Sequence, residues 1–192
     1  HDALLGFDAE DFHRGQFFPE EESLVRTLTE SVEEYYLPRC NHLTAASPGI
    51  ATAYAETIGV QKPDVILNVF SLDERHGHTP PEVLEAEKPA EGVISLYWYS
   101  QVIGPNRGLL DALRALSFLE DHVHLTLRGT WAEGFEDQLR SEAGALGVEH
   151  RLRVLPPAPP DQLVERAAQH DVGLALEQST KVNRDLCITN KI

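Results

Sequence analysis

The stretch YSQVIGPNRGLLDAL, residues 99–113, combines residue types that bind phosphate groups. An apolar run ends at Gly104, and Arg107 and Gly108 stand where a segment with helical spacing begins. The free N–H groups and dipole at a helix N-terminus favour an anion, and a guanidinium can hold a phosphate with two hydrogen bonds. The turn lacks full G-x-G-x-x-G spacing and is not a Walker A loop, so it indicates a phosphate site without dinucleotide or P-loop chemistry.

Three further segments follow predicted strands, where open parallel α/β sheets bind their ligands. The segment GTWA (129–132) has a glycine that permits close backbone approach and the flat face of Trp131, although by itself it fits a β-turn with a partly buried aromatic better than a ligand site. The second segment is residues 156–160. The third, EQSTKVNRDLCITNK (177–191), is polar and rich in cations and amides, and fits either a sugar-phosphate site or a solvated loop.

The elements that must position these residues alternate between strands and helices. In the first part, the spacing predicts an amphipathic helix over 20–37, with Leu24, Leu28, Val32 and Tyr35 on one stripe. A strand is predicted at 41–47, a helix from Pro48 to Gly59, and a buried strand at 65–69. The order helix, strand, helix, strand is typical of a layered α/β architecture with a parallel sheet.

The second part continues this alternation. Strands are predicted at 93–100, 123–129, 151–155 and 171–177, and helices at 107–119, 133–146 and 159–170. Four strands alternating with three helices predict a doubly wound sheet. The polar, proline-containing segment 71–92 lacks sustained periodicity and is predicted to link a first domain, residues 1–70, to a second, residues 93–192.

Composition excludes several classes of function. The 31 acidic residues outnumber the 16 basic ones and give a net charge of −15, which repels a nucleic-acid backbone. No transmembrane segment and no signal peptide is expected, so we predict a cytoplasmic protein. Cys40 and Cys187 lack partners at metal-ligand spacing, which favours reduced thiols over a disulfide or a zinc site.

The order of four segments resembles the C-terminal domain of retaining GT-B glycosyltransferases of the family-4 type. These segments are LYWYSQVIGPNRGLLDAL, VHLTLRG, RLRVLPPAPPDQLVERAAQHDVGLALE and NRDLCITNKI. The earlier segment CNHLTAASPGIATAYAETIGVQKPDVILNVF resembles the end of the N-terminal domain, and FDAEDF (7–12) stands where many members carry an acceptor-side motif. The resemblance implies two Rossmann-like domains, each only partly present in an incomplete chain.

The resemblance also implies a set of site residues. Arg107, Gly104, Gly108, Asn190 and Lys191 would hold the diphosphate of a nucleotide-sugar donor. Gly129, Thr130, Leu155 and Glu177 would line the nucleotide or sugar, and Glu10 and His13 would lie on the acceptor side. Such enzymes transfer the sugar with retention of configuration and need neither a metal ion nor another cofactor. The acceptor, whether saccharide, lipid, protein or small molecule, and the catalytic residues stay unassigned.

Two departures from the family pattern keep other functions open. Glu10 replaces the histidine of many members, and Asp185-Leu186 stands near the position of the first of two characteristic glutamates. The leading hypothesis is therefore a glycosyltransferase, and the alternative is a non-catalytic module of the same fold that binds nucleotide sugars or acts as a scaffold. A sugar-nucleotide epimerase is a weaker alternative.

Overall fold

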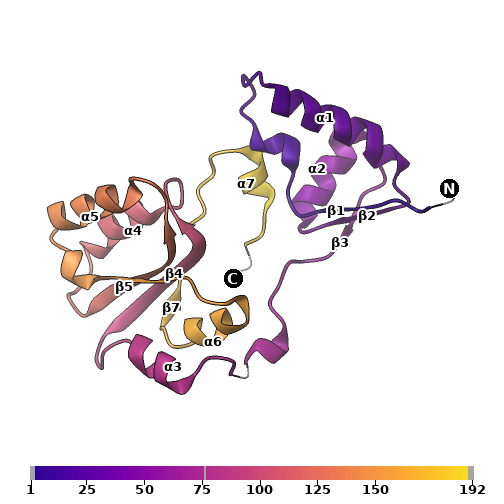
Figure 1. The fold of residues 1–192 in the computed structure, drawn as a ribbon. Helices are drawn as coiled ribbons and strands as arrows, with labels where there is room; N and C mark the ends of the chain where they lie inside the picture. The colour runs from indigo at the N-terminus through magenta and orange to yellow at the C-terminus, as the bar shows by residue number, and fades with distance from the viewer. Residues whose placement is uncertain (1–2, 76, 190–192) are drawn as a thin grey trace. The chain divides into compact units, whose positions relative to one another are not determined.

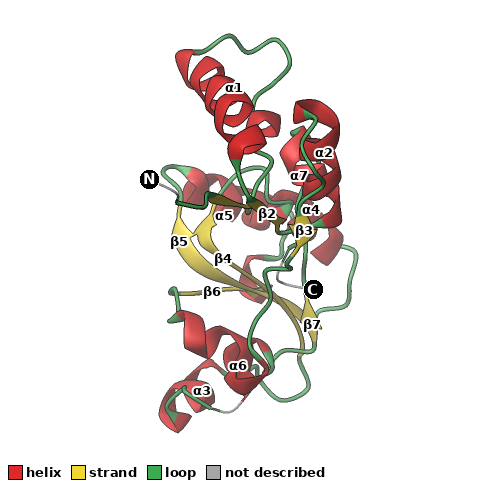
Figure 2. Cartoon of the chain, turned by 90° about the vertical axis from the view of Figure 1, so that its right-hand side faces the viewer, coloured by secondary structure: helices red, strands yellow, loops and turns green. Residues whose placement is uncertain are grey.

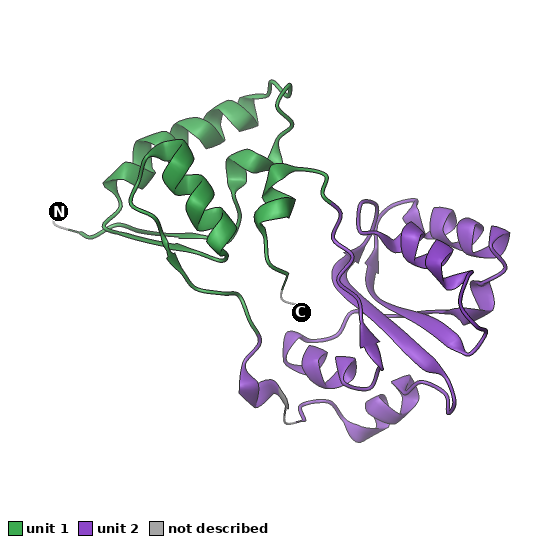
Figure 3. Ribbon diagram, turned by 180° about the vertical axis from the view of Figure 1, so that it is seen from behind, with its two compact units in different colours: residues 1–69, 179–190 green, residues 70–178, 191–192 purple. Residues whose placement is uncertain are grey.

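The computed structural model describes residues 3–75 and 77–189, which form two compact units. The first unit contains residues 3–69 and 179–189, and the second contains residues 70–75 and 77–178 (Figure 3). This division differs from the predicted one in two segments. Residues 71–92, the predicted linker, belong to the second unit, and the returning segment 179–189 belongs to the first.

The first unit is built on a parallel sheet in the order β1-β2-β3. Its strands are β1 (Gly6–Ala9), β2 (His42–Ala45) and β3 (Asp64–Val65), and its helices are α1 (Leu24–Tyr36), α2 (Pro48–Ile58) and α7 (Val182–Leu186) (Figure 1). Ser47 caps α2 by accepting a hydrogen bond from the Ile50 N–H, and Gly59 ends α2 at a φ of 75°. The structure thus confirms the predicted helix from Pro48 to Gly59.

Two apolar segments of the first unit are exposed, although their patterns favoured burial. Helix α1 lies within the predicted range 20–37 but begins only at Leu24, after its N-cap Ser23. Leu24 and Leu28 on its apolar stripe are 74% and 54% exposed, and its buried residue is Glu33. The strand predicted at 65–69 is also shorter, because only Val65 of these residues lies in β3 and Ile66 is 62% exposed. Side-chain periodicity predicts the element but does not show which neighbour covers it.

The second unit contains a four-stranded parallel sheet in the order β6-β5-β4-β7. Its strands are β4 (Ile94–Ile103), β5 (Val123–Trp131), β6 (Leu152–Leu155) and β7 (Val172–Gly173), and its helices are α3 (Pro81–Glu87), α4 (Leu109–Leu116), α5 (Phe135–Ala145) and α6 (Leu163–Ala167) (Figure 2). Counted along the unit this order is 3-2-1-4, which confirms the doubly wound architecture. The predicted fourth strand, 171–177, is reduced to two paired residues.

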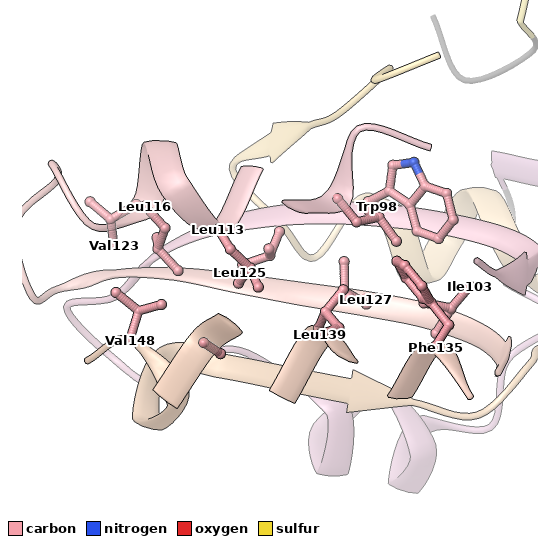
Figure 4. Close-up of a cluster of buried hydrophobic side chains, with 12 residues drawn as sticks. Trp98, Ile103, Leu113, Leu116, Val123, Leu125, Leu127, Phe135, Leu139 and Val148 are labelled. Atoms are coloured by element: carbon pink, nitrogen blue, oxygen red, sulfur yellow. The ribbon is translucent and has the colours of Figure 1, made fainter. Parts of the chain in front are cut away.

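One face of this sheet packs against α4 and α5 through apolar side chains. Trp98 from β4 and Leu125 and Leu127 from β5 meet Leu113 of α4 and Leu139 of α5, all with exposed fractions of 1% or less (Figure 4). Strand alternation places Leu96 and Trp98 on this face, so that Ser95 and Tyr97 point to the other. This apolar face holds α4 and α5 against the sheet.

The other face of the sheet is held by buried ions. Arg128 of β5 is 1% exposed, and its Nη2 lies 2.5 Å from Oε2 of Glu87 at the end of α3. Nη1 of Arg166 in α6 lies 2.8 Å from the other oxygen of Glu87. Arg153 donates to the main-chain carbonyl oxygens of Ala86 and Glu87. These contacts explain why the predicted linker packs as part of the second unit.

None of the helices in the described part of the chain is long and apolar enough to cross a membrane.

Candidate functional site

The sheet of the second unit changes winding direction between β4 and β7. From β4 the chain continues to β5 on one side, whereas β7 lies on the other side of β4. In open α/β sheets, ligands bind outside the carboxyl ends of the two strands at such a switch point. The turn 104–108 follows β4, and residues 174–178 follow β7. The topology therefore brings together two of the four segments predicted from the sequence.

A cavity of about 310 Å³ lies at this place. Its lining consists of the turn from Gly104 to Gly108, the first residues of α4, one side of α5 and a single residue after β7. These residues are Gly104, Pro105, Asn106, Arg107, Gly108, Leu109, Leu110, Asp111, Arg114, Phe135, Gln138 and Gln178. The volume is at the lower end of the range for small-molecule sites.

The turn before α4 depends on two residues with positive φ. Asn106 has a φ of 59° and Gly108, the N-cap of α4, has a φ of 68°. A Cβ on Gly108 would lie 2.6 Å from the carbonyl oxygen of Leu176, so glycine also allows the close approach of the chain after β7. With glycine at the cap, no side chain caps α4, and the first N–H groups of the helix face the turn. The predicted role of Gly108 in keeping the turn open has this structural basis.

The cavity has two arginines and one carboxylate in its lining. Arg107 is half-buried in the turn before α4, and Arg114 lies in the second turn of α4. Nη1 of Arg114 lies 3.2 Å from Oδ1 of Asp111, and Nε2 of Gln178 donates to Oδ2 of the same carboxylate at 2.6 Å. Nε of Arg114 also lies 3.1 Å from Oε1 of Glu142, so Arg114 is paired with two carboxylates. Arg107 is the other cation of the lining and stands beside the N-terminus of α4, where the helix dipole favours an anion.

Three of the predicted donor-site residues, Gly104, Arg107 and Gly108, line this cavity together. Asn190 and Lys191 lie outside the described residues. Of the predicted nucleotide-lining residues, Glu177 is half-buried. Burial, together with the charges of Tyr97 and Glu177, raises the pKa of Tyr99 to about 12. Its neighbour Gln178, and not Glu177, lines the cavity.

The other three predicted nucleotide-lining residues lie in strands of the sheet and do not line this cavity. They are Gly129 and Thr130 in β5 and Leu155 in β6. A Cβ on Gly129 would lie 2.4 Å from the carbonyl oxygen of Ser100, where the register of β4 against β5 shifts. Thr130 pairs with Val102, and Leu155 is a buried residue at the end of β6. The glycine therefore permits close contact between two strands at this bend.

Arg114, Gln138 and Gln178 were not predicted to belong to the site. Arg114 follows Arg107 by seven residues, a spacing of about two helical turns that placed both on one side of the predicted helix. That signal was present in the sequence. Gln178 gave no comparable signal, because the short β7 and the path of residues 174–178 decide which side chain enters the cavity.

The predicted acceptor-side residues follow β1 in the first unit. Glu10 is exposed, whereas His13 is half-buried and lines a separate apolar pocket of about 600 Å³ with Phe7 and Val32. The backbone N–H of His13 donates to the hydroxyl of Tyr54, which in turn donates to the buried Glu33 at 2.7 Å. Burial, followed by this bond to Glu33, raises the pKa of Tyr54 far above its ordinary value.

Comparison with solved structures identifies proteins of the same fold. No family model and no curated protein sequence matches the chain. Anabaena HepE in complex with UDP has a TM-score of 0.69 and 19% identity, over 93% of this chain and 48% of that one. WaaG, a glycosyltransferase involved in lipopolysaccharide biosynthesis, has a TM-score of 0.66 and 13% identity, over 90% and 50% of the two chains. A glycosyltransferase from Rickettsia africae has a TM-score of 0.61 and 17% identity, over 76% and 41%.

The chain has the GT-B fold in part. At identities of 13 to 19% the likeness concerns the fold, and function has to be argued from the site. The chain spans 41 to 50% of the length of these three structures. This agrees with the expectation of two partly present Rossmann-like domains.

Proposed function

We propose that this chain is the nucleotide-sugar-binding part of a glycosyltransferase. The observation that carries the proposal is the cavity at the β4–β7 switch point, where Arg107, Gly104 and Gly108 meet the N-terminus of α4. Anions bind at helix N-termini, and arginine binds phosphate oxygens in pairs. The similarity to HepE, whose structure was solved with UDP, supports a nucleoside diphosphate as the ligand.

In this proposal the cavity acts on the departing diphosphate. As the bond between the sugar and the diphosphate breaks, negative charge grows on the leaving oxygen. Arg107 and the dipole of α4 stabilise that charge without a metal ion, because both are in place before the reaction starts. The sugar passes with retention of configuration to an acceptor bound by the first unit near Glu10 and His13.

Titration calorimetry on the intact protein with UDP, GDP and UDP-glucose tests the proposal. We expect one of the nucleotides to bind, and Arg107→Ala to weaken its binding by about 1.5–3 kcal/mol, which is about 10- to 150-fold in Kd. Arg140→Ala is the matched control, because Arg140 is an exposed arginine on α5 that pairs with Glu136 and does not line the cavity. Absence of nucleotide binding, or an unchanged Kd for Arg107→Ala, would refute the assignment.

One observation favours the alternative of a non-catalytic nucleotide-sugar-binding module. The position that resembles the first family glutamate is held by Asp185, and this residue is exposed on α7 in the first unit. A donor-hydrolysis assay with UDP-glucose separates the two functions. Turnover supports the transferase, whereas binding without turnover supports the module.

A further inference from the structure

The apolar pocket that contains His13 is formed by the first unit. Its volume is about 600 Å³, and its lining comes from β1, the 3-10 turn His13–Gln16, α1 and the residues next to them. All of the described residues in this lining belong to the first unit. A pocket of this volume can hold a small-molecule ligand.

One wall of the pocket is part of the apolar stripe of α1. Val25, Leu28 and Val32 follow one another at helical spacing and are 64%, 54% and 51% exposed. Phe7 and Leu37 also line the pocket, and Leu37 belongs to the core of the unit while Phe7 packs against it. Apolar surface that is both exposed and gathered in a pocket marks a place for a ligand or partner.

The pocket is long. Its lining residues on α1 extend from Val25 to Tyr36, which is about 16 Å at 1.5 Å per residue. An extended hydrocarbon chain can cover apolar side chains along this whole length. A sugar with many hydroxyl groups would instead lose hydrogen bonds to water without replacement, because these side chains are apolar.

The charges in and around the pocket oppose an anionic ligand. Among the described lining residues there is no lysine or arginine, and the carboxylate of Glu33 already lies 2.6 Å from Nε of Arg14 and accepts the Tyr54 hydroxyl at 2.7 Å. The surrounding segment 20–36 contains six glutamates and one arginine. A carboxylate or phosphate head group would therefore be repelled, and so would an anionic bilayer, which binds helices with basic polar faces.

His13 supplies a hydrogen-bonding group to this apolar pocket. Its backbone N–H donates to the Tyr54 hydroxyl at 3.2 Å, and that hydroxyl is bonded to the buried Glu33. Its ring meets the ring of Phe7 edge to face, with centroids 6.5 Å apart. Within residues 3–75 and 77–189 the ring nitrogens of His13 have no hydrogen-bond partner, so one of them can accept the O–H of a ligand.

We propose that this pocket binds an uncharged long-chain alcohol, with its hydrocarbon chain along α1 and its hydroxyl group at His13. This inference rests on the proposed function, in which the alcohol is the acceptor of the sugar. It selects a lipid alcohol from the acceptor classes that the sequence left unassigned. The length and apolar character of the α1 wall select the chain, and His13 selects the hydroxyl group.

Titration of the intact, ¹⁵N-labelled protein with 1-octanol, followed by NMR, tests the pocket. We expect saturable shifts at the amides of Phe7 and Val32 and unchanged positions for the amides of α5 in the second unit. Octanoate has the same hydrocarbon tail with a carboxylate head, and it should bind about tenfold more weakly or worse. Octanol shifts that do not saturate, or equal affinity for octanoate, would refute the proposal.

Two variants of α1 test its wall. Leu28→Gln should weaken octanol binding about four- to tenfold, because the chain covers the exposed half of Leu28. Leu24→Gln is the matched control, since Leu24 is 74% exposed on the same helix and is not among the lining residues, so its Kd should stay the same. Both leucines are exposed, so both variants are expected to fold. Equal effects on the Kd would overturn the assignment of this wall.

A second ligand tests His13. Methyl octyl ether lacks the O–H donor of octanol, so the unchanged protein should prefer octanol by about two- to tenfold, the value of one hydrogen bond. His13→Phe keeps a ring beside Phe7 and should abolish this preference. A purely structural role for His13 predicts that the variant weakens both ligands equally, and a preference that survives rules out hydroxyl binding by His13.

Other occupants of the α1 stripe give different results. If the stripe pairs with a second copy of the chain, sedimentation shows a dimer that Leu28→Gln dissociates. If it lies in a membrane, the protein binds vesicles of neutral phosphatidylcholine, and Leu24→Gln and Leu28→Gln both weaken that binding. Either result without saturable octanol binding refutes the alcohol site.

Separate titrations with UDP and octanol distinguish this inference from the proposed function. UDP binding without octanol binding refutes the alcohol site and leaves the proposed function standing. Octanol binding without nucleotide binding refutes the proposed function, and the acceptor role fails with it.

With UDP-glucose and octanol together we expect octyl glucoside. In this product the octanol oxygen is bonded to the sugar carbon that UDP leaves, and the hydroxyl proton is released with UDP. Hydrolysis of UDP-glucose without octyl glucoside refutes the acceptor role.

Discussion

Glu87 is the residue whose replacement we expect to destabilise the second unit most. It is 9% exposed and contacts two buried guanidiniums, those of Arg128 at 2.5 Å and Arg166 at 2.8 Å. Glu87→Gln keeps the shape of the side chain but removes its charge. The amide NH2 group of the glutamine then faces the N–H donors of one guanidinium. Two buried cations then lack their counter-ion.

The expected cost follows from burial. Breaking a buried ion pair by neutralising one partner costs about 3–5 kcal/mol, because the remaining charge stays out of water. Arg128 keeps its bonds to the Tyr97 hydroxyl and the Pro156 carbonyl oxygen, which favours the lower end, about 3 kcal/mol. The bonds from Arg153 to the backbone of α3 do not involve the carboxylate, so α3 is expected to stay attached.

The matched control is Glu136→Gln on the surface of α5. Glu136 contacts Arg140 at 2.8 Å, but the side chains are 42% and 45% exposed, so the pair contributes about 0.5 kcal/mol or less. Urea unfolding followed by tryptophan fluorescence measures both variants. Trp98 and Trp131 are the two tryptophans of the chain, and both lie in the second unit, so the signal reports that unit.

We expect the free energy of unfolding to fall by about 3 kcal/mol for Glu87→Gln and by under about 0.5 kcal/mol for the control. Equal losses in the two variants would show that burial does not make the Glu87 pairs important. In that case the ionic explanation for how α3 joins the second unit would be wrong.

Two further predictions concern Gly108 and His170. Gly108→Ala should lower the free energy of unfolding by about 1–3 kcal/mol more than Gly134→Ala. Both glycines are N-caps near a φ of 70°, but only a Cβ on Gly108 would meet Leu176. Equal losses in urea unfolding would refute this reasoning. The ring of His170 stacks on Tyr97, and burial lowers the pKa of His170 from 6.5 to about 4. The unfolded chain therefore binds the proton first as the pH falls, and stability should drop by about 1–2 kcal/mol between pH 6.5 and 4, less than the full shift because solvent reaches the ring. In His170→Asn this part of the pH dependence should be absent, and an identical pH profile of unfolding would contradict the role of the ring.

The sequence contained much of the local structure and part of the site. The helix starts at Pro48 and near Gly108, and the strands from Ile94 and Val123, were predicted because they depend on neighbouring residues and on side-chain periodicity. The same local signals predicted that Gly104, Arg107 and Gly108 share one turn. The pattern at 171–177 predicted the fourth strand but not its length, because the two residues of β7 are defined by their pairing with β4.

By itself, the sequence determined the alternation of strands and helices and the glycine turn that opens α4, because backbone conformation and periodicity are local properties. Only the tertiary structure decided that the apolar stripe of α1 is exposed, that Gln178 lines the cavity, and that Asn183 bonds to Asp11. These facts depend on contacts between residues up to 172 positions apart. Such contacts are fixed by how sheets and helices pack, and no local pattern encodes them.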